Sequence, residues 1–160
     1  VKLETANFSG RMDNLRSSIL IPQLEELDKK VTQWNKLYNV LNDNLKKQNG
    51  IFFPNRDSDE YFVGSSIQFR IDSLNNEQIK SFINNCKARG VELKWFGDEK
   101  PVAYTSRYDS WKYLDNIPRL ANTLRILAKT FDMRIPLTFT VQDCNIISEI
   151  IIEELQKVQN

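Results

Sequence analysis

One long amphipathic stripe in the first third of the chain constrains its fold more than any other feature. From Leu24 to Leu45 the apolar residues recur at alternating steps of three and four, which is typical of one face of an α-helix. Leu37 and Val40 widen this stripe beyond the narrow seam of a coiled coil, so we expect the helix to pack on its own domain. Pro22 is expected in its first turn, and a shorter helix is expected before it.

The rest of the chain alternates strand and helix patterns. Short strands are predicted near residues 51–53, 62–71, 91–95 and 133–137, and helices after Asn75, from Pro118 and after Thr140. We therefore expect an α+β fold, in which a small, mostly antiparallel sheet has its helices on one face and follows a long N-terminal helix. The 160 residues predict one domain, with a helical segment at 1–48 and a small α+β part at 49–160.

The absence of histidine excludes whole classes of chemistry. Without histidine this chain cannot form a Ser-His-Asp or Cys-His catalytic group or a histidine metal motif. Its two cysteines, Cys86 and Cys144, are too far apart in sequence to form a C-x-x-C site. We therefore predict no metal site and no self-contained set of catalytic residues. Both cysteines fall on or beside apolar helix faces, where we expect buried, free thiols in a reducing compartment.

Charge and hydropathy limit the classes of partner that we expect the chain to bind. Lys and Arg number 22 and Asp and Glu number 21, and this balance does not indicate a nucleic-acid binder. No apolar run is long enough for a membrane span, and the N-terminus lacks the apolar core of a signal peptide. We therefore expect a cytoplasmic protein that binds neither nucleic acid nor membrane.

A long aperiodic segment, residues 96–116, is the first candidate for function. Arg107 has the guanidinium fork that pairs with a carboxylate or phosphate, while Tyr104, Tyr108 and Trp111 have the flat apolar faces that line pockets and interfaces. We predict that these four residues bind substrate. The alternative is an ordered loop whose aromatic side chains pack on the sheet and whose arginine pairs with a nearby aspartate.

Three motifs, two near the start of the chain and one near its end, resemble a known enzyme family. Residues 7–15, Asn-Phe-Ser-Gly-Arg-Met-Asp-Asn-Leu, and residues 23–28, Gln-Leu-Glu-Glu-Leu-Asp, look like the start of the C-terminal region of DegT/StrS-type aminotransferases. Residues 134–137, Arg-Ile-Pro-Leu, followed by Thr140 and Asp143, resemble the closing strand and last helix of that family. Its members are fold-type-I enzymes that use pyridoxal phosphate (PLP).

The resemblance implies that the chain is the C-terminal domain of a PLP-dependent aminotransferase, which transfers an amino group to a keto substrate such as a keto sugar. It places the Schiff-base lysine upstream of Val1, and a first residue other than Met agrees with that expectation. PLP would then belong to the full-length parent, whereas this chain alone would hold no cofactor and be inactive. The implied partners are the missing N-terminal large domain and a second subunit in a homodimer.

The resemblance also assigns cofactor-binding residues. Asn7 resembles the asparagine that reaches the PLP phosphate of the neighbouring subunit, and Arg11 lies close to it in sequence. The two stand four residues apart here and two apart in the family pattern, and the alternative is that both serve the start of a helix. Many members carry a histidine-containing substrate stretch where this chain has Arg107, so Arg107 is expected to take an anionic substrate or amino donor.

Two other functions stay open from the sequence. One is a standalone interaction or dimerisation module, built on the long helix and the aromatic segment. The other is a regulatory domain that binds a small ligand.

Overall fold

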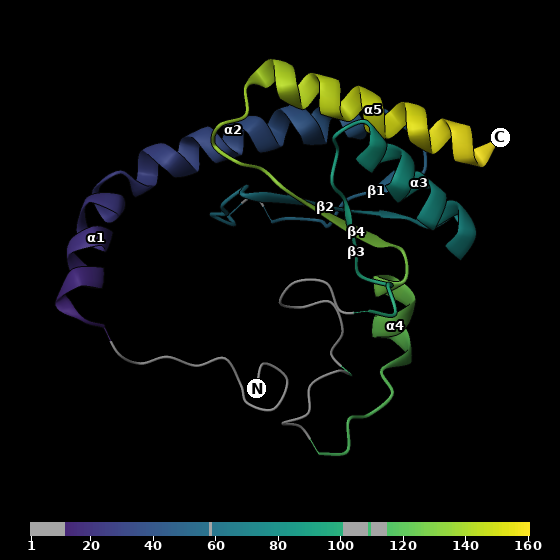
Figure 1. Cartoon of the computed structure of the whole chain (residues 1–160), viewed down its shortest axis with the longest axis horizontal. Coiled ribbons are helices and arrows are strands. Elements are labelled where there is room, and N and C mark those ends of the chain that lie inside the picture. The colour runs from purple at the N-terminus through teal and green to yellow at the C-terminus, as the bar shows by residue number, and fades with distance from the viewer. Residues whose placement is uncertain (1–11, 58, 101–108, 110–114) are drawn as a thin grey trace.

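The computed structural model describes residues 12–57, 59–100, 109 and 115–160 (Figure 1). Within these residues the helices and strands follow one another in the order that the sequence predicts. Their bounds are α1 (Asn14–Glu25), α2 (Leu27–Leu45), β1 (Ile51–Phe52), β2 (Ser66–Ile71), α3 (Asn76–Ala88), β3 (Lys94–Trp95), α4 (Ala121–Leu127), β4 (Thr130–Arg134) and α5 (Val141–Gln159).

The strands form one antiparallel sheet in the order β1-β2-β4-β3. Alternate residues of β2, namely Ile67, Phe69 and Ile71, are buried, whereas the residues between them are not. This period of two places the apolar side chains on one face, and α2, α3 and α5 lie together over that face (Figure 1). The short helix α4 lies apart from these three. The predicted α+β class, with a small antiparallel sheet, is confirmed.

Aromatic rings from two strands and a helix form the centre of the core. The rings of Phe69 and Phe131 are stacked with centroids 5.5 Å apart, and Phe82 of α3 meets Phe131 edge-on at 5.6 Å. Phe69 and Phe131 stand opposite each other in the register of β2 and β4, so the strand pairing itself brings the rings together. The core therefore depends on residues that lie far apart in the sequence.

Two helices begin at the capping motifs that the sequence predicts. The side chain of Asn75 accepts a hydrogen bond from the backbone N–H of Gln78 at 2.9 Å, and Gln78 returns one to the Asn75 backbone. Thr140 and Asp143 make the same reciprocal pair at the start of α5. Each box satisfies backbone donors that the first turn of a helix leaves unpaired.

The predicted start of the long helix is wrong. The helix is divided at Glu26, and Pro22 lies inside α1 rather than in the first turn of α2. Pro22 has no N–H to donate to the carbonyl of Ser18, so α1 lacks one internal hydrogen bond there. The apolar stripe runs through Glu26 without interruption, and periodicity therefore could not reveal the break. Its first two positions, Leu24 and Leu27, are exposed.

The predicted strand at 62–71 is too long, because β2 begins only at Ser66. Asn35 of α2 holds the preceding residues instead. Its side-chain amide donates to the carbonyl of Phe62 at 3.0 Å, and its side-chain oxygen accepts from the N–H of Gly64 at 2.7 Å. A helix side chain thus takes hydrogen bonds that a neighbouring strand would otherwise make.

The elements around the last strand also begin elsewhere than predicted. The strand spans Thr130–Arg134 rather than 133–137, and the preceding helix begins at Ala121, three residues after Pro118. Phe131 lies in β4, where it packs on Phe69 and Phe82, rather than on the preceding helix. Likewise β3 is shorter than the predicted strand at 91–95.

Candidate functional site

The side chains that the sequence marks as binding residues lie outside the described part of the chain. The structure therefore neither brings them together nor separates them, and their roles stay predictions. They are Asn7, Arg11, Tyr104, Arg107, Tyr108 and Trp111.

The first residues of the candidate segment 96–116 are described, and they are anchored to the turn between α4 and β4. The indole N–H of Trp95 donates to the carbonyl of Ala128 at 2.9 Å, and the N–H of Phe96 donates to the carbonyl of Thr130 at 3.1 Å. A Cβ on Gly97 would stand 2.8 Å from the backbone Cα of Ala128, so only glycine fits this approach. The segment therefore leaves the sheet from a fixed point.

The face of the sheet turned away from α2, α3 and α5 carries polar and charged side chains. In the register, Gln68, Asp132 and Lys94 stand side by side on three adjacent strands, and Ser66 and Arg134 form the next pair. The amine of Lys94 lies 4.7 Å from the ring centroid of Phe96, at the start of the anchored segment. This face and the anchored segment are thus neighbours, and together they can offer both charge signs to a ligand or a second domain.

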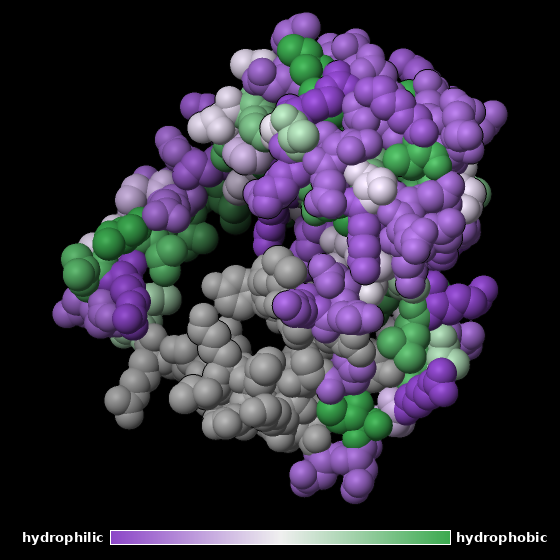
Figure 2. Space-filling model, turned by 45° about the vertical axis from the view of Figure 1, so that its right-hand side comes forward, coloured by the Kyte–Doolittle hydropathy of each residue, from purple (hydrophilic) through white to green (hydrophobic). Residues whose placement is uncertain are grey.

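Helix α1 presents the most exposed apolar surface among the described residues. None of its residues is buried, and Leu15 is 72% exposed and Leu24 65%. Figure 2 shows its apolar side chains gathered along the helix, which stands off from the body of the molecule. Exposed apolar side chains gathered in this way are typical of a surface that another domain or protein covers. The sequence pattern predicted the helix, but periodicity alone does not show what its apolar side chains contact.

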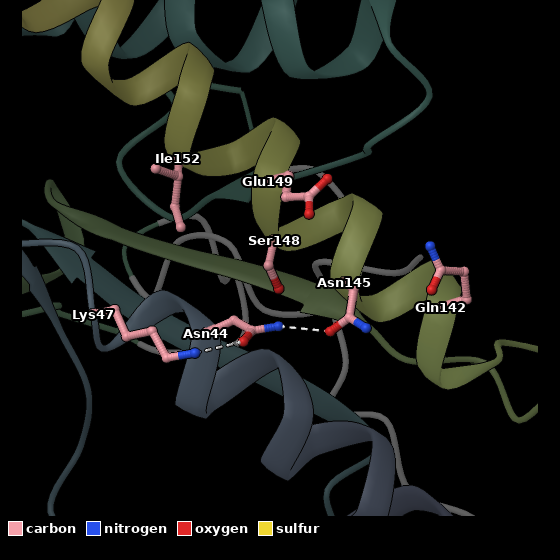
Figure 3. Close-up of a pocket in the computed structure, with 7 residues that line it drawn as sticks. All are labelled: Asn44, Lys47, Gln142, Asn145, Ser148, Glu149 and Ile152. Atoms are coloured by element: carbon pink, nitrogen blue, oxygen red, sulfur yellow. Dashed lines mark hydrogen bonds between the residues drawn. The ribbon is translucent and has the colours of Figure 1, made fainter.

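A polar groove of about 300 Å³ lies between α2 and α5 (Figure 3). Across it, the side-chain amide of Asn44 donates to the side-chain oxygen of Asn145 at 2.8 Å. On the α2 side, the amine of Lys47 donates to Asn44 at 3.2 Å. The hydroxyl of Ser148 donates to the carbonyl of Cys144 at 2.7 Å, so no side chain acts as its general base. One hydrogen bond thus joins the two helices across the groove, and its described residues offer no activated nucleophile.

The two cysteines are free and fully buried, as the sequence predicts. Burial raises the pKa of the Cys86 thiol to about 12 and also raises the pKa of Cys144. A thiol with a raised pKa is a poor nucleophile at neutral pH, so both act as packing residues. No cluster of three or more possible metal ligands occurs within the described residues. Their helices also include none with the length and apolarity to cross a membrane.

Sequence comparison identifies one family. The sequence profile of the DegT/DnrJ/EryC1/StrS aminotransferase family matches residues 2–151. None of the curated proteins compared with the chain matches it.

Solved aminotransferase structures share the fold. The aminotransferase TlmJ from Streptoalloteichus hindustanus superposes with a TM-score of 0.75 at 13% identity, over 98% of this chain and 41% of that one. The 3-amino-5-hydroxybenzoic acid (AHBA) synthase gives a TM-score of 0.73 at 18% identity, over 96% and 41%. A DegT/DnrJ/EryC1/StrS aminotransferase from Brucella abortus gives 0.61 at 14% identity, over 92% and 39%. The chain thus spans about two fifths of the length of these structures.

Proposed function

Because the chain belongs to the DegT/DnrJ/EryC1/StrS aminotransferase family, we propose that it forms the C-terminal part of a PLP-dependent aminotransferase. In this proposal a helical segment, residues 1–48, leads into a small α+β domain, residues 49–160. One observation carries it: nearly the whole chain superposes on only about two fifths of the aminotransferase structures. The reaction is amino transfer to a keto substrate, for which a keto sugar is the first candidate, in the cytoplasm.

The Schiff-base lysine and most of the cofactor site belong to the upstream part of the enzyme. Among the described residues, two hollows contain a cationic side chain, and neither combines a lysine for a Schiff base with a phosphate site free of carboxylates. The groove between α2 and α5 contains Lys47 but also the carboxylate of Glu149, which opposes a phosphate. A second hollow, beside β1, contains Arg70 but no lysine. The chain alone is therefore expected to be inactive, and no step of the reaction is assigned to its described residues.

The N-terminal segment and the aromatic segment are the parts of the chain that would reach the shared active site. In this proposal Asn7 and Arg11 bind the PLP phosphate of a neighbouring subunit, which requires a homodimer. Arg107 pairs with an anionic substrate or donor group, with Tyr104, Tyr108 and Trp111 beside it. The anchoring of Trp95, Phe96 and Gly97 supports this, because a fixed origin limits the positions that a long segment can reach.

Helix α1 supports the proposal that the upstream large domain packs on this chain. An isolated helix shorter than about 12–15 residues is marginal in water, and α1 has 12 residues, none of them buried. Covering Leu15, Ile19 and Leu24 would supply the missing stabilisation. The same exposure favours the second candidate, a standalone interaction module, in which a different protein covers α1.

Trapping the cofactor tests the proposal. Borohydride reduction of the full-length protein with PLP, followed by peptide mass mapping, is expected to show one adduct, on a lysine upstream of Val1. The isolated chain is expected to show none and to have no transaminase activity. Lys94→Arg in the full-length protein serves as the control and should leave the adduct unchanged. An adduct on any lysine within residues 1–160 would contradict the proposal.

A further inference from the structure

A second hollow, of about 360 Å³, lies beside the edge strand β1, on the face of the sheet turned away from α2, α3 and α5. Its apolar lining comes from β1 and the residues after it, from β2 and from the last turn of α4. The apolar lining residues are Phe52, Phe53, Pro54, Phe69, Ile126 and Leu127. A concave, mostly apolar hollow with a few polar groups is the common form of a small-molecule site.

Three strands build the floor of this hollow from one row of residues. Phe52 of β1, Arg70 of β2 and Thr130 of β4 stand opposite one another in the register, so their side chains share a face. Thr130 uses its hydroxyl in a hydrogen bond to the carbonyl of Ile126 at 2.8 Å, which closes the hollow toward α4. Arg70 is therefore the central charged group of the row.

The guanidinium of Arg70 makes an ion pair through one of its nitrogens and has further N–H donors. Its Nε lies 2.7 Å from Oδ1 of Asp72, and its guanidinium carbon lies 5.5 Å from the ring centroid of Phe52. The buried Nε makes this ion pair with Asp72 but no hydrogen bond, and among the described residues no hydrogen bond to the Nη amines is found either. A guanidinium with unpaired N–H donors is the group that proteins use to bind a carboxylate through two hydrogen bonds.

A second cation flanks the same hollow. The amine of Lys46 lies 5.9 Å from the ring centroid of Phe53. Two lining rings thus each carry a cation. Asp72 offsets part of the charge of Arg70, but no described carboxylate lines the hollow, so its lining suits an anion with a flat apolar body. A ligand that satisfies both is an aromatic ring bearing a carboxylate.

We propose that this hollow binds a small aromatic carboxylate, with the carboxylate on the Nη amines of Arg70 and the ring between Phe52 and the end of α4. The carboxylate replaces water on Arg70, and the ring buries the apolar lining around Phe53, Ile126 and Leu127. The inference does not depend on the proposed transaminase function, since every group that it uses lies within this chain.

Titration of the ¹⁵N-labelled chain tests the site, with benzoate as the probe and amide chemical shifts as the readout. Benzoate is expected to shift the amides of Phe53, Gln68 and Thr130 in a saturable way. Benzamide keeps the ring but not the charge, and acetate keeps the charge but not the ring. Each should bind at least about tenfold more weakly than benzoate, because each loses one of the two interactions.

Two arginine variants on the same sheet face distinguish the site from general attraction to positive charge. Arg70→Gln should weaken benzoate binding at least about tenfold, while Arg134→Gln, which lies outside the hollow, should leave it unchanged. If Arg70→Gln disturbs the fold, as its amide spectrum would show, Arg70→Lys replaces it and should also weaken binding. No saturable shift at these amides, equal binding of benzamide or acetate, or an equal effect of Arg134→Gln would overturn the proposal.

Discussion

At the scale of single residues, the candidate segment depends on a glycine whose importance only the fold reveals. An added Cβ on Gly97 would lie 2.6 Å from the indole of Trp95 and 2.8 Å from the Cα of Ala128. The second contact is with backbone, which cannot rotate out of the way as a side chain can. Gly97 therefore fixes how closely the start of the segment approaches the turn before β4.

Gly97→Ala is expected to destabilise the chain by about 2 kcal/mol, because Trp95 or the turn at Ala128 must move. Urea unfolding followed by tryptophan fluorescence measures this change. Gly90→Ala is the control, because its Cβ would meet nothing within 4 Å and the only cost is the backbone strain of alanine at a φ of +86°. Its cost should be about 1 kcal/mol. A Gly97→Ala variant as stable as the parent chain would show that the approach is not needed.

The role of a residue that bonds to its neighbours in sequence could be predicted, whereas the role of a residue that contacts distant parts of the chain could not. The caps at Asn75 and Thr140 bond to residues three positions away, so their spacing alone predicts them. The alternation of β2 placed Arg70 on the polar face, but nothing in the sequence shows that Phe52 and Ile126 border it. Those neighbours come from strand register and from the position of α4.

At the scale of elements, helices were predicted better than the ends of strands. The stripe on α2 and the apolar face of α3 follow from periods that a single helix sets by itself. The start of β2 instead depends on Asn35 of α2, and the position of β4 depends on Phe131 meeting Phe69. Strand ends are set by partners elsewhere in the chain, which one sequence does not identify.

An ionic contact joins α3 to α5. The guanidinium of Arg89, at the end of α3, lies 2.8 Å from Glu154 of α5, and the amine of Lys157 lies 2.7 Å from the same carboxylate. Hydrogen bonds from Lys157 and then Arg89 lower the pKa of Glu154 below its ordinary 4.5. Glu154 has only 4% of its side chain exposed, whereas the neighbouring Glu153, also paired with Arg89, has 55% exposed.

The lowered pKa of Glu154 predicts a loss of stability in acid. A carboxyl group whose pKa is lower when folded contributes fully above its unfolded pKa, and the contribution disappears as the pH falls through the folded pKa. Glu154→Gln should therefore lower the free energy of unfolding at about pH 7 and weaken its fall between about pH 5 and pH 2. Urea midpoints across this range measure both effects.

Glu153→Gln is the matched control, because it removes a neighbouring and more exposed partner of Arg89. An exposed ion pair contributes little, so this variant should keep the parent's pH profile. Identical profiles for Glu154→Gln and the parent chain would show that the link between α3 and α5 is not electrostatic.

At the scale of the whole molecule, the described residues divide into a part with a shared core and one helix, α1, that lies outside it. α2, α3, α5 and the sheet bury a shared core, whereas α1 buries none of its residues. The sequence predicted the fold class and the family, because both depend on element order and short motifs. The assembled site could not be predicted in the same way, because Asn7, Arg11 and Arg107 lie outside the described residues and the proposed Schiff-base lysine would lie outside this chain.

Replacing exposed apolar side chains of α1 shows whether this helix stabilises the isolated chain or only the proposed full-length enzyme. In the isolated chain, Leu15→Ser with Ile19→Ser should change the free energy of unfolding by less than about 1 kcal/mol, because both side chains are already exposed. In the full-length protein the same pair should cost about 3 kcal/mol or more, because the large domain would cover both side chains.

The control pair is Val141→Ser with Ile146→Ser on α5, where the two side chains are 37% and 44% exposed. This pair should have little effect in either form. Urea unfolding of the isolated chain and of the full-length protein compares the two pairs directly. Equal, small effects of the α1 pair in both forms would mean that the large domain does not cover this helix. A large loss already in the isolated chain would instead mean that α1 packs within residues 1–160, since a helix can contribute to stability only where its side chains are removed from water.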